Sequence, residues 1–556
     1  MNQALLLLVG MALLFPMLPR DKPWARFLAV AVLEWACLRY LHFRWFDAFP
    51  RDLLSPAGLW QFAFLCAETV ALGHTMLTGL VLVRHKDRRG DADRYEADLI
   101  AKGDYPTVDV LIPTYNEPEP VLRKTMEGCL GIAWPRQRLT IHFLDDGGRD
   151  WLRDLCKANG INYHRRAKKG GGKAGNLNYA LAASSAEYIC CLDADFIPAP
   201  RILTRLVPLC RSEADIGLVQ TPQHYDNPDP VQWNLAGNGE WTEEQRFFCD
   251  VVEPSRDAWN AAFCIGTGWV AKRAAINAIG GKIPEDTVCE DMYTTYTMRG
   301  HGIRTIYLDE ALAYGLAAES IGEYTAQRVR WCQGTVQTLY APYGMLRCPN
   351  LSIIDRILYF DLIWYWSGFT FLALLAIAPA VYWFLRVPVF EAELATIAAA
   401  VLPRVAATLY LTYWLSGGKV VPLATEVKKT VLMWNIVPAF WQALWRPENL
   451  TFRVTNKGVA MDKPIMRWAI AWPFLAVLLL NLLGMGINLS ASTQIVEWDQ
   501  YMVMNLLLSL YGVVLAFLCL LACVDRPKGA GYWDRTQTLH GSFFGTVVAL
   551  WRRWTG

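Results

Sequence analysis

Acidic residues follow short apolar segments at two places in the middle of the chain. Asp145 and Asp146 come directly after residues 139–144, and Asp193 and Asp195 come after residues 188–192. Carboxylate oxygens are the ligands that hard divalent cations prefer, and such a cation neutralises the charge of a departing diphosphate. The pattern favours a site for a nucleotide with Mg²⁺ or Mn²⁺. Solvated loop carboxylates are the commoner origin of a lone Asp-x-Asp.

A glycine-rich segment lies between the two acidic positions. It reads KGGGKAGN from Lys169 to Asn176. Glycines let the backbone approach an anion closely, and the ammonium of Lys173 is a point charge suited to phosphate. An ordinary surface loop of the same composition is an equally good interpretation of this segment by itself.

The elements that would position these residues are typical of an α/β fold. Residues 108–113, 139–144 and 188–192 are short apolar runs that predict strands, and residues 120–130 predict a helix joining the first strand to a parallel second one. Open α/β sheets bind ligands at the carboxyl ends of their strands. Because side chains alternate along a strand, we expect Asp193 and Asp195 to lie on one side of the third strand end.

The remainder of the chain is strongly apolar. Hydrophobic residues make up 54% of the sequence and the mean hydropathy is +0.19. Runs near the roughly 20 residues needed to cross a bilayer predict membrane helices at 24–45, 62–83, 357–384, 395–415, 468–487 and 502–524. The shorter run 4–18 lacks the basic start and small-residue cleavage site of a signal peptide, so we expect a retained helix.

Charge patterning predicts which side of the membrane each part occupies. Basic residues flank the second and third apolar runs on one side, at Arg20, Lys22, Arg26, Arg84, Lys86, Arg88 and Arg89. The loop with Asp47 and Asp52 is charge-balanced, so the central domain is predicted to be cytoplasmic. The net charge of +2 gives no indication of nucleic-acid binding. The 14 cysteines lack metal-ligand spacing and are predicted to be reduced, buried thiols.

Nine motifs in order, set between membrane segments, resemble the family 2 glycosyltransferases of the bacterial cellulose synthase type over nearly the whole chain. They are PTYNE (113–117), DDGG (145–148), KAGNLN (173–178), DAD (193–195), QTPQ (220–223), FCIGTG (263–268), CED (289–291), QRVRW (327–331) and FRVTNK (452–457). The resemblance implies a multi-span α-helical membrane protein with an inserted cytoplasmic GT-A (Rossmann-like) domain. Its expected parts are membrane helices 1–90, a catalytic domain 91–345, channel helices 346–525 with a gating loop 450–466, and a short tail 526–556.

The resemblance also implies roles for individual residues. Asp291 is the expected catalytic base, which takes a proton from the acceptor hydroxyl in a single inverting displacement. The expected metal ligands are Asp193 and Asp195. The donor nucleotide is expected to contact Thr114, Tyr115, Glu117, Asp145, Asp146, Lys173, Gln327, Arg330, Thr455 and Lys457. The acceptor sugar is expected to contact Phe263, Cys264, Glu290 and Trp331.

Simpler interpretations of the same residues stand beside these roles. Asp291 could cap the helix that residues 292–299 predict. The QRVRW segment could belong to an ordinary amphipathic helix with an aromatic anchor, within the interfacial helix that we expect at 321–340. A further interfacial helix is expected at 427–445.

The sequence departs from the family pattern at several positions. Cys289 stands where a threonine is usual, Phe196 stands where a histidine is common, and FCIGTG replaces a differently spaced stretch near the acceptor. These changes leave the linkage of the product open. The tail 526–556 is too short for the cyclic-di-GMP-binding PilZ barrel that bacterial cellulose synthases usually carry.

The resemblance implies a processive enzyme of the bacterial inner membrane that polymerises UDP-glucose into a β-1,4, β-1,3 or mixed β-glucan and translocates it, with a periplasmic accessory subunit as a possible partner. One alternative is a chitin- or hyaluronan-type synthase that uses UDP-GlcNAc. Another is a non-processive transferase to a lipid carrier, which the QRVRW motif and the later helices disfavour. A nucleotide-gated transporter is an alternative of a different class, and it would not need Asp291.

Overall fold

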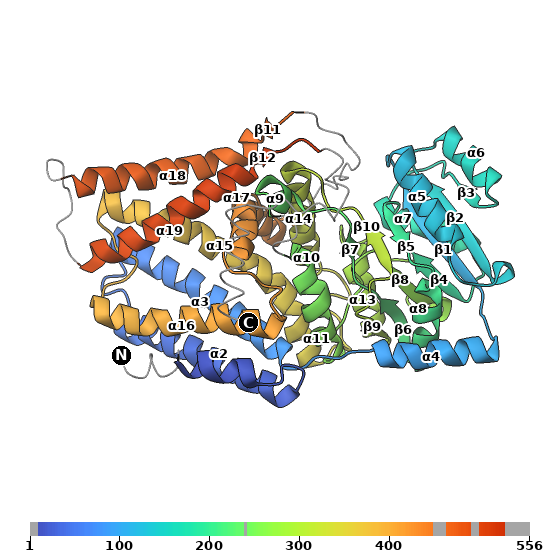
Figure 1. The fold of residues 1–556 in the computed structure, drawn as a ribbon, viewed down its shortest axis with the longest axis horizontal. Coiled ribbons are helices and arrows are strands. Elements are labelled where there is room, and N and C mark those ends of the chain that lie inside the picture. The colour runs from blue at the N-terminus through green and yellow to red at the C-terminus, as the bar shows by residue number, and fades with distance from the viewer. Residues whose placement is uncertain (1–8, 238–241, 449–462, 491–499, 529–556) are drawn as a thin grey trace.

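The chain folds into a bundle of long helices beside an α/β domain (Figure 1). The computed structural model describes residues 9–237, 242–448, 463–490 and 500–528. The bundle consists of α2 (Pro23–His42), α3 (Pro56–Leu82), α15 (Ile353–Leu385), α16 (Leu394–Ser416), α17 (Ala424–Trp445), α18 (Trp468–Leu489) and α19 (Gln500–Ala522). The helical turns at 9–14 and η1 (Phe15–Met17) precede α2, and η2 (Phe43–Asp47) continues it.

Within the described residues, five helices are long and apolar enough to cross a membrane, namely α3, α15, α16, α18 and α19. They confirm five of the predicted spans. The run 24–45 forms α2 and η2, but it falls outside this group because Arg26, Glu34 and Arg39 lie in α2. That α2 crosses the bilayer therefore stays a prediction.

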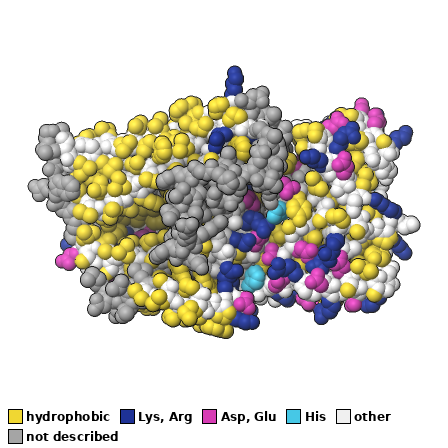
Figure 2. Space-filling model, viewed as in Figure 1, with side chains coloured by type: hydrophobic (Ala, Val, Ile, Leu, Met, Phe, Trp, Pro, Cys, Tyr) yellow, Lys and Arg dark blue, Asp and Glu magenta, His cyan; other side chains and the backbone are white. Residues whose placement is uncertain are grey.

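Apolar side chains are exposed over the outside of the bundle (Figure 2). Leu482 is 47% exposed, Leu483 55% and Leu507 63%, all on α18 or α19. Exposed apolar area of this extent is typical of a surface that contacts lipid, whereas the charged side chains gather over the α/β domain (Figure 2). The protein is therefore a membrane protein with one polar end.

A seven-stranded mixed sheet organises the α/β domain in the order β3-β2-β1-β4-β8-β6-β9. The strands are β1 (Val108–Thr114), β2 (Leu139–Asp145), β3 (Asn162–His164), β4 (Tyr188–Cys191), β6 (Ile216–Gln220), β8 (Trp269–Lys272) and β9 (Arg304–Tyr307). A smaller sheet contains β5 (Phe196–Pro198), β10 (Ala313–Gly315) and β7 (His224–Tyr225).

The three predicted strands form β1, β2 and β4, which are parallel neighbours. Val108 pairs in register with Leu139 on one side and with Tyr188 on the other. The helix predicted to join the first two strands is α5 (Glu119–Leu130). The carboxyl ends of these strands therefore meet at one edge of the sheet, as the sequence predicted.

Helices cover both faces of the sheet and bury two apolar cores. One core packs β1, β2 and β4 against α5 and its neighbours, and the other packs the opposite face against α7 and α12. The helices of this domain are α4 (Arg89–Lys102), α6 (Asp150–Ala158), α7 (Gly172–Ala183), α8 (Ile202–Arg211), α9 (Pro230–Asn234), α10 (Glu244–Phe247), α11 (Glu253–Asp257), α12 (Arg273–Ala278) and α13 (Glu290–Gly300), with η3 (Arg136–Arg138) and η4 (Phe248–Val252). All 14 cysteines are unpaired and 13 are buried, which confirms the prediction of structural thiols.

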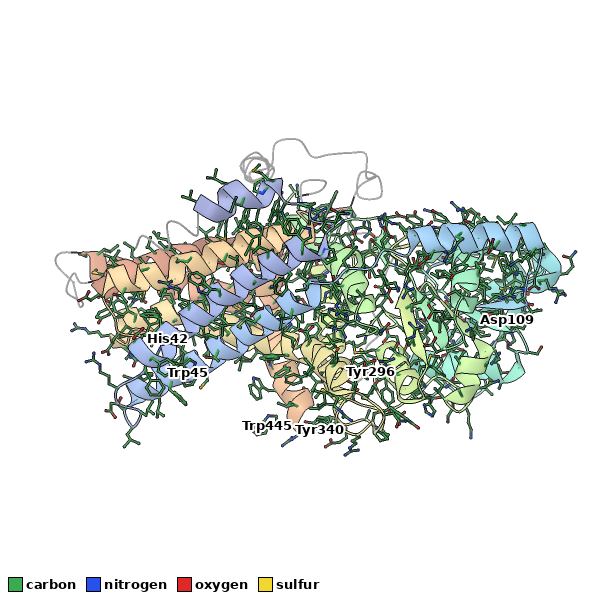
Figure 3. The ribbon with its side chains drawn as sticks, turned by 90° about the horizontal axis from the view of Figure 1, so that it is seen from below. His42, Trp45, Asp109, Tyr296, Tyr340 and Trp445 are labelled. Atoms are coloured by element: carbon green, nitrogen blue, oxygen red, sulfur yellow. The ribbon has the colours of Figure 1, made fainter. Side chains whose placement is uncertain are left out.

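The helix α14 (Ile321–Gln337) joins the two parts of the molecule. It begins where the Ser320 hydroxyl accepts a hydrogen bond from the Glu323 amide, and it packs against α17 and α15. The Tyr340 hydroxyl donates to the carbonyl of Leu444, and Tyr340 and Trp445 lie together at the lower edge in Figure 3. In the same view Tyr296 lies between the bundle and the sheet (Figure 3).

Two predicted segments fall partly or wholly outside the described residues. Residues 450–462 of the expected gating loop are among them, with Thr455 and Lys457, and so is the tail from residue 529. Between these two segments, β11 (Ile465–Met466) pairs antiparallel with β12 (Val524–Asp525).

Candidate active site

Asp145 lies at the end of β2 and is held by arginine. Arg149 donates from its side chain at 2.8 Å and 3.2 Å and from its backbone amide at 2.6 Å, and the Tyr163 hydroxyl donates at 2.9 Å. Burial alone would raise the pKa of Asp145, but the bonds from Arg149 outweigh it and hold the pKa below its ordinary value. This carboxylate is therefore an ionised, fixed acceptor.

Asp146 is also held by arginine. Arg166 donates from Nε to Oδ1 at 2.7 Å and from Nη2 to Oδ2 at 2.6 Å, which is the two-pronged geometry that guanidinium and carboxylate groups favour. Both groups are at most 13% exposed. The two acidic residues at the end of β2 thus face different arginines.

The end of β1 lies beside them. The Thr114 hydroxyl donates to Glu117, and Arg149 Nη2 donates to the Thr114 hydroxyl at 2.7 Å. The Tyr115 amide also donates to the Glu117 carboxylate, at 2.8 Å. The Tyr115 side chain is 41% exposed, so its ring is available to stack on a nucleobase. These three predicted donor-binding residues form one group with Asp145.

The glycine-rich loop ends in the first turn of α7. Gly171 has φ +65° and Gly172 has φ +53°, a left-handed conformation in which side chains are strained. Lys173 follows, and its Nζ donates to Asp193 Oδ1 at 2.5 Å and to the Gly266 carbonyl at 2.6 Å. Burial lowers the pKa of Lys173, but Asp193 raises it well above the ordinary value, so the ammonium stays charged.

The Asp-x-Asp pair lies beyond the strand and not in it. β4 ends at Cys191, and residues 193–196 form a turn in which the Phe196 amide donates to the Asp193 carbonyl at 3.0 Å. Strand alternation therefore does not set the directions of Asp193 and Asp195, because both lie in a turn, and that they share one side stays a prediction. Asp193 faces Lys173, whereas Asp195 is 8% exposed and adds to the raised pKa of Tyr225, after burial.

The chemistry of this turn fits a magnesium-type ion that shares its ligands with a substrate. Among the described residues no group of three or more His, Cys, Asp or Glu side chains forms a metal cluster. Mg²⁺ commonly takes only one or two carboxylates and completes its shell with waters and substrate phosphate. The partly exposed Asp193 carboxylate is a ligand of that kind.

Asp291 lies in the first turn of α13 and is half-buried. Its Oδ1 accepts from the Met292 amide at 2.8 Å. A Cβ on Gly266, which has φ +103°, would meet Asp291 Oδ2 at 2.8 Å, so only glycine fits between Asp291 and Lys173. Cys289, and not Asp291, is the N-cap residue of α13. The simpler interpretation of Asp291 as the helix cap is therefore wrong.

The two acidic residues of α13 have raised pKa values. Burial raises the pKa of Glu290 to about 7, and the adjacent Asp291 adds to the increase. Burial also raises the pKa of Asp291, while Lys173 opposes the increase. A carboxylate whose affinity for protons is increased in this way is suited to accept one from a hydroxyl.

The QRVRW residues lie on α14 close to α13. The guanidinium of Arg328 lies 4.1 Å from the centre of the Trp331 ring and donates to the Gln327 side chain at 2.9 Å. The Cys289 thiol contacts the Arg330 carbonyl at 3.9 Å. Burial raises the pKa values of both Cys289 and Asp291, and Arg330 offsets part of each increase. The motif and the acidic residues thus form one site.

A cavity of about 410 Å³ leads from this site into the bundle. Asp291, Cys289 and Trp331 line its catalytic end, together with Phe263 and Cys264. Residues of three predicted membrane helices also line it, among them His74, Thr75 and Thr78 of α3, Asp361 and Tyr365 of α15, and Thr408 and Thr412 of α16. Hydroxyl and charged side chains inside a bundle of this kind are typical of a path for a polar molecule.

The predicted acceptor residues differ in their surroundings. The Phe263 amide donates to Glu253, and the Phe263 ring faces the Arg256 guanidinium at 5.4 Å. The Cys264 amide donates to the Thr295 hydroxyl of α13 at 2.8 Å. Both residues are buried and line the wall of the cavity, whereas the partly buried Trp331 ring lines it under the Arg328 guanidinium.

Sequence reasoning missed four residues that hold this site together. They are Arg149, Tyr163, Arg166 and Arg328. Arg149 follows the DDGG motif directly and Arg328 lies inside QRVRW, so their positions gave a signal. Tyr163 and Arg166 lie on a short edge strand and its following loop, where no pattern indicated a role.

The fold and this arrangement define a glycosyltransferase domain, and residues 109–280 match the family model described as glycosyl transferase family 2. The UDP-forming cellulose synthase catalytic subunit of Pseudomonas fluorescens (strain SBW25) is 35% identical over 387 residues, which are 69% of this chain and 52% of that protein. The UDP-forming cellulose synthase 1 catalytic subunit of Komagataeibacter xylinus is 30% identical over 452 residues, 81% of this chain and 59% of that protein.

The chain is therefore a homologue of cellulose synthase catalytic subunits that contains a family 2 glycosyl transferase domain. It spans between about half and three fifths of the length of these relatives. Among solved structures, a mannosyltransferase from Pyrobaculum calidifontis in complex with GDP-Man and Mn²⁺ is 20% identical with a TM-score of 0.45, covering 69% of this chain and 99% of that chain.

Proposed function

We propose that this protein is a processive, inverting glycosyltransferase that polymerises UDP-glucose into a β-glucan and passes the polymer through its own helices. The observation that carries the proposal is the cavity that Asp291 and Trp331 share with α3, α15 and α16. An acceptor held at Trp331 would have its reacting end at the half-buried Asp291 carboxylate and its remaining length inside the bundle. The relatives' description as UDP-forming cellulose synthase subunits supports UDP as the released product.

The reaction would proceed as a single displacement. Asp291 takes the proton of the acceptor hydroxyl as that oxygen attacks the anomeric carbon of the donor, and the bond between this carbon and the UDP oxygen breaks. An α-linked donor then gives a β-linked product. Lys173, 2.5 Å from Asp193, supplies positive charge on the side from which the diphosphate leaves.

The donor would lie between the strand ends and the glycine loop. Tyr115 stacks on the base, and Asp145 and Asp146 accept hydrogen bonds from the nucleoside, with Gln327 and Arg330 on the opposite side. Asp193 and Asp195 would hold Mg²⁺ or Mn²⁺, whose charge would stabilise the departing diphosphate. Thr455 and Lys457, outside the described residues, are proposed to close over the bound donor.

Trp331 would keep the polymer bound between additions. A tryptophan ring offers a flat apolar face to a pyranose, and Arg328 stacked at 4.1 Å fixes the orientation of that ring. Release of UDP would then leave the chain end in place for the next donor. We further propose that the catalytic domain is cytoplasmic, that the membrane is the bacterial inner membrane, and that a periplasmic subunit receives the polymer.

The test is incorporation of radiolabel into insoluble polymer by the purified full chain in lipid nanodiscs with Mg²⁺. UDP-glucose and UDP-N-acetylglucosamine are compared, and the product is digested with β-1,4- and β-1,3-glucanases. Polymer from UDP-glucose that either glucanase degrades is the expected result, and the sensitive enzyme names the linkage.

Other outcomes would replace the proposal with a specific alternative. Polymer from UDP-N-acetylglucosamine alone would identify a chitin- or hyaluronan-type synthase. Label in a lipid extract without polymer would identify a non-processive transferase. Nucleotide-dependent transport that survives Asp291→Asn would identify a transporter.

A further inference from the structure

One arginine contacts both the nucleoside side and the phosphate side of the donor site. Arg166 holds the Asp146 carboxylate with Nε and Nη2, and its Nη1 donates to the Gly170 carbonyl at 2.7 Å. Nη2 also donates to the Gly172 carbonyl at 3.3 Å. The side chain is 8% exposed, so these bonds are protected from water.

The loop that Arg166 holds is rich in glycine. It runs through three successive glycines, and Gly171 and Gly172 both have positive φ. Glycine backbone loses more conformational freedom on ordering than any other, so fixed donors to its carbonyls matter here. A Cβ on Gly175 would meet the Gly170 carbonyl oxygen at 2.1 Å and Arg166 Nη1 at 2.9 Å, so the loop closes tightly around the guanidinium.

The position of Lys173 depends on this loop. Gly172 is the first residue of α7 and Lys173 the second, and Lys173 reaches Asp193 and Gly266 from there. Movement of the Gly170 and Gly172 carbonyls would therefore move the ammonium that faces the diphosphate. Asp146, on β2, is connected to that ammonium through Arg166.

We propose that Arg166 is a positioning residue that couples nucleobase recognition at Asp146 to diphosphate binding at Lys173. The proposal rests on the proposed donor site. A base that engages Asp146 would compete for the oxygens that Arg166 holds, and the guanidinium would pass that change to the glycine loop. The planar fork of arginine, with five N–H donors, suits one carboxylate and two carbonyls, which a lysine ammonium could not bridge with the same geometry.

Inorganic pyrophosphate separates the two ends of this connection, because it has no base to contact Asp146. Its binding to the full chain in nanodiscs with excess Mg²⁺ is measured by calorimetry, with UDP measured in parallel. We expect Arg166→Gln to weaken pyrophosphate binding about tenfold, a size typical of coupling between sites. Asp146→Asn should weaken it similarly, and the double variant should be no weaker than either single variant.

Matched variants separate coupling from charge and from folding. Arg165 is the neighbouring residue, and its side chain is 58% exposed. Arg165→Gln removes the same charge and should leave pyrophosphate binding within about twofold. Arg166→Lys keeps the charge and removes the fork, so it should weaken binding in the same direction even if Arg166→Gln unfolds. Thermal unfolding of each variant is recorded beside its affinity.

The results distinguish this proposal from the proposed function. If the unchanged protein binds UDP and pyrophosphate but Asp146→Asn leaves pyrophosphate affinity unaltered, the coupling is overturned and the donor site stands. Additive losses in the double variant would also overturn it. An unchanged protein that binds neither ligand would overturn the donor site itself.

Discussion

The site contains two pairs of adjacent acidic residues whose surroundings are opposite. Asp145 and Asp146 each face an arginine, at 2.8 Å and 2.6 Å, and the pKa of Asp145 is lowered. Glu290 and Asp291 are both half-buried, and burial raises both pKa values. The same chemical group is thus kept ionised at one end of the site and made proton-accepting at the other.

The difference follows from the elements that carry each pair. Arg149 comes from the turn that starts directly after β2, so it reaches back to Asp145 four residues away. The first turn of α13 lines the cavity, and Lys173, which opposes the raised pKa of Asp291, already pairs with Asp193. The neighbouring charged side chains, and not the residue type, therefore decide which carboxylates bind the donor and which accepts a proton.

The largest effect is expected from a substitution in the proton-accepting pair, Glu290 and Asp291. Asp291→Asn keeps the shape of the side chain and removes its basicity, so polymer synthesis should fall about a thousandfold, about 4 kcal/mol in the barrier. UDP affinity should stay within about threefold, because Asp145 and Asp146 are untouched. Initial rates of label incorporation and calorimetric UDP binding measure the two quantities.

Asp286→Asn is the matched control for this variant. Asp286 lies five residues earlier on the chain and is exposed. Its replacement should leave the rate within about twofold, as surface changes usually do. A similar loss in both variants would show that the rate depends on the overall charge of this segment and not on a base.

The pH dependence should separate the two pairs as well. A base works only when deprotonated, so a raised pKa moves the loss of activity to higher pH. Because burial raises the pKa of Asp291, kcat/KM should begin to decline at a pH above the ordinary carboxyl range, approaching tenfold per pH unit. UDP affinity should persist to much lower pH, because the lowered pKa of Asp145 keeps it ionised.

Rates and UDP affinities measured from about pH 4.5 to about pH 9 check this separation, because this range begins just above the ordinary carboxyl pKa of about 4. Parallel loss of rate and affinity at acidic pH would mean that both pairs titrate together. The contrast between the pairs would then be wrong.

Removal of one arginine should convert a binding carboxylate into a buried, poorly paired charge. Arg149→Gln leaves the Asp145 side chain, which is 0% exposed, without its guanidinium, and should lower the free energy of unfolding by about 2 kcal/mol. UDP affinity should also fall. Denaturant unfolding, followed by a signal from the catalytic domain, measures the free energy of unfolding, and calorimetry measures the UDP affinity.

Arg153→Gln provides the comparison. Arg153 forms its ion pairs with Asp150 and Asp154 at the surface, where the side chain is 52% exposed. Such pairs contribute about 0 to 1 kcal/mol, so this variant should be nearly neutral. Equal destabilisation by both changes would contradict the special position of Arg149.

The sequence predicted the parts of the site that lie at strand ends. β1, β2 and β4 are apolar runs that stop at polar residues, and parallel pairing brings those stops together without further information. The five most apolar helices were likewise evident from composition. These features depend on local pattern and on one general rule of sheet topology.

The partners of the charged groups could not be predicted in the same way. Arg166 reaches Asp146 from 20 residues away, from a loop with no periodic pattern, and Lys173 meets the Gly266 carbonyl across 93 residues. The Asp193 turn shows the limit of strand alternation, since β4 stops at Cys191. Long-range pairing of side chains is a property of the packed fold that short-range patterns do not carry.

The smallest expected effect concerns Cys289, the residue beside the proton-accepting pair that departs from the family pattern. Its thiol lies 3.9 Å from the Arg330 carbonyl, and it caps α13 without a side-chain hydrogen bond. Cys289→Ser should change the rate of synthesis by less than about threefold. It should raise the free energy of unfolding by up to about 1 kcal/mol, because a serine hydroxyl can accept an N-cap hydrogen bond. Cys129→Ser, in the apolar core, should instead destabilise the protein, because its hydroxyl would lack a helix N-terminus to bond. Initial rates and unfolding curves of the two variants measure this contrast. A loss above tenfold in Cys289→Ser would show that the thiol itself adjusts the basicity of Asp291, so the proton-accepting pair would have to be redefined as a group of three.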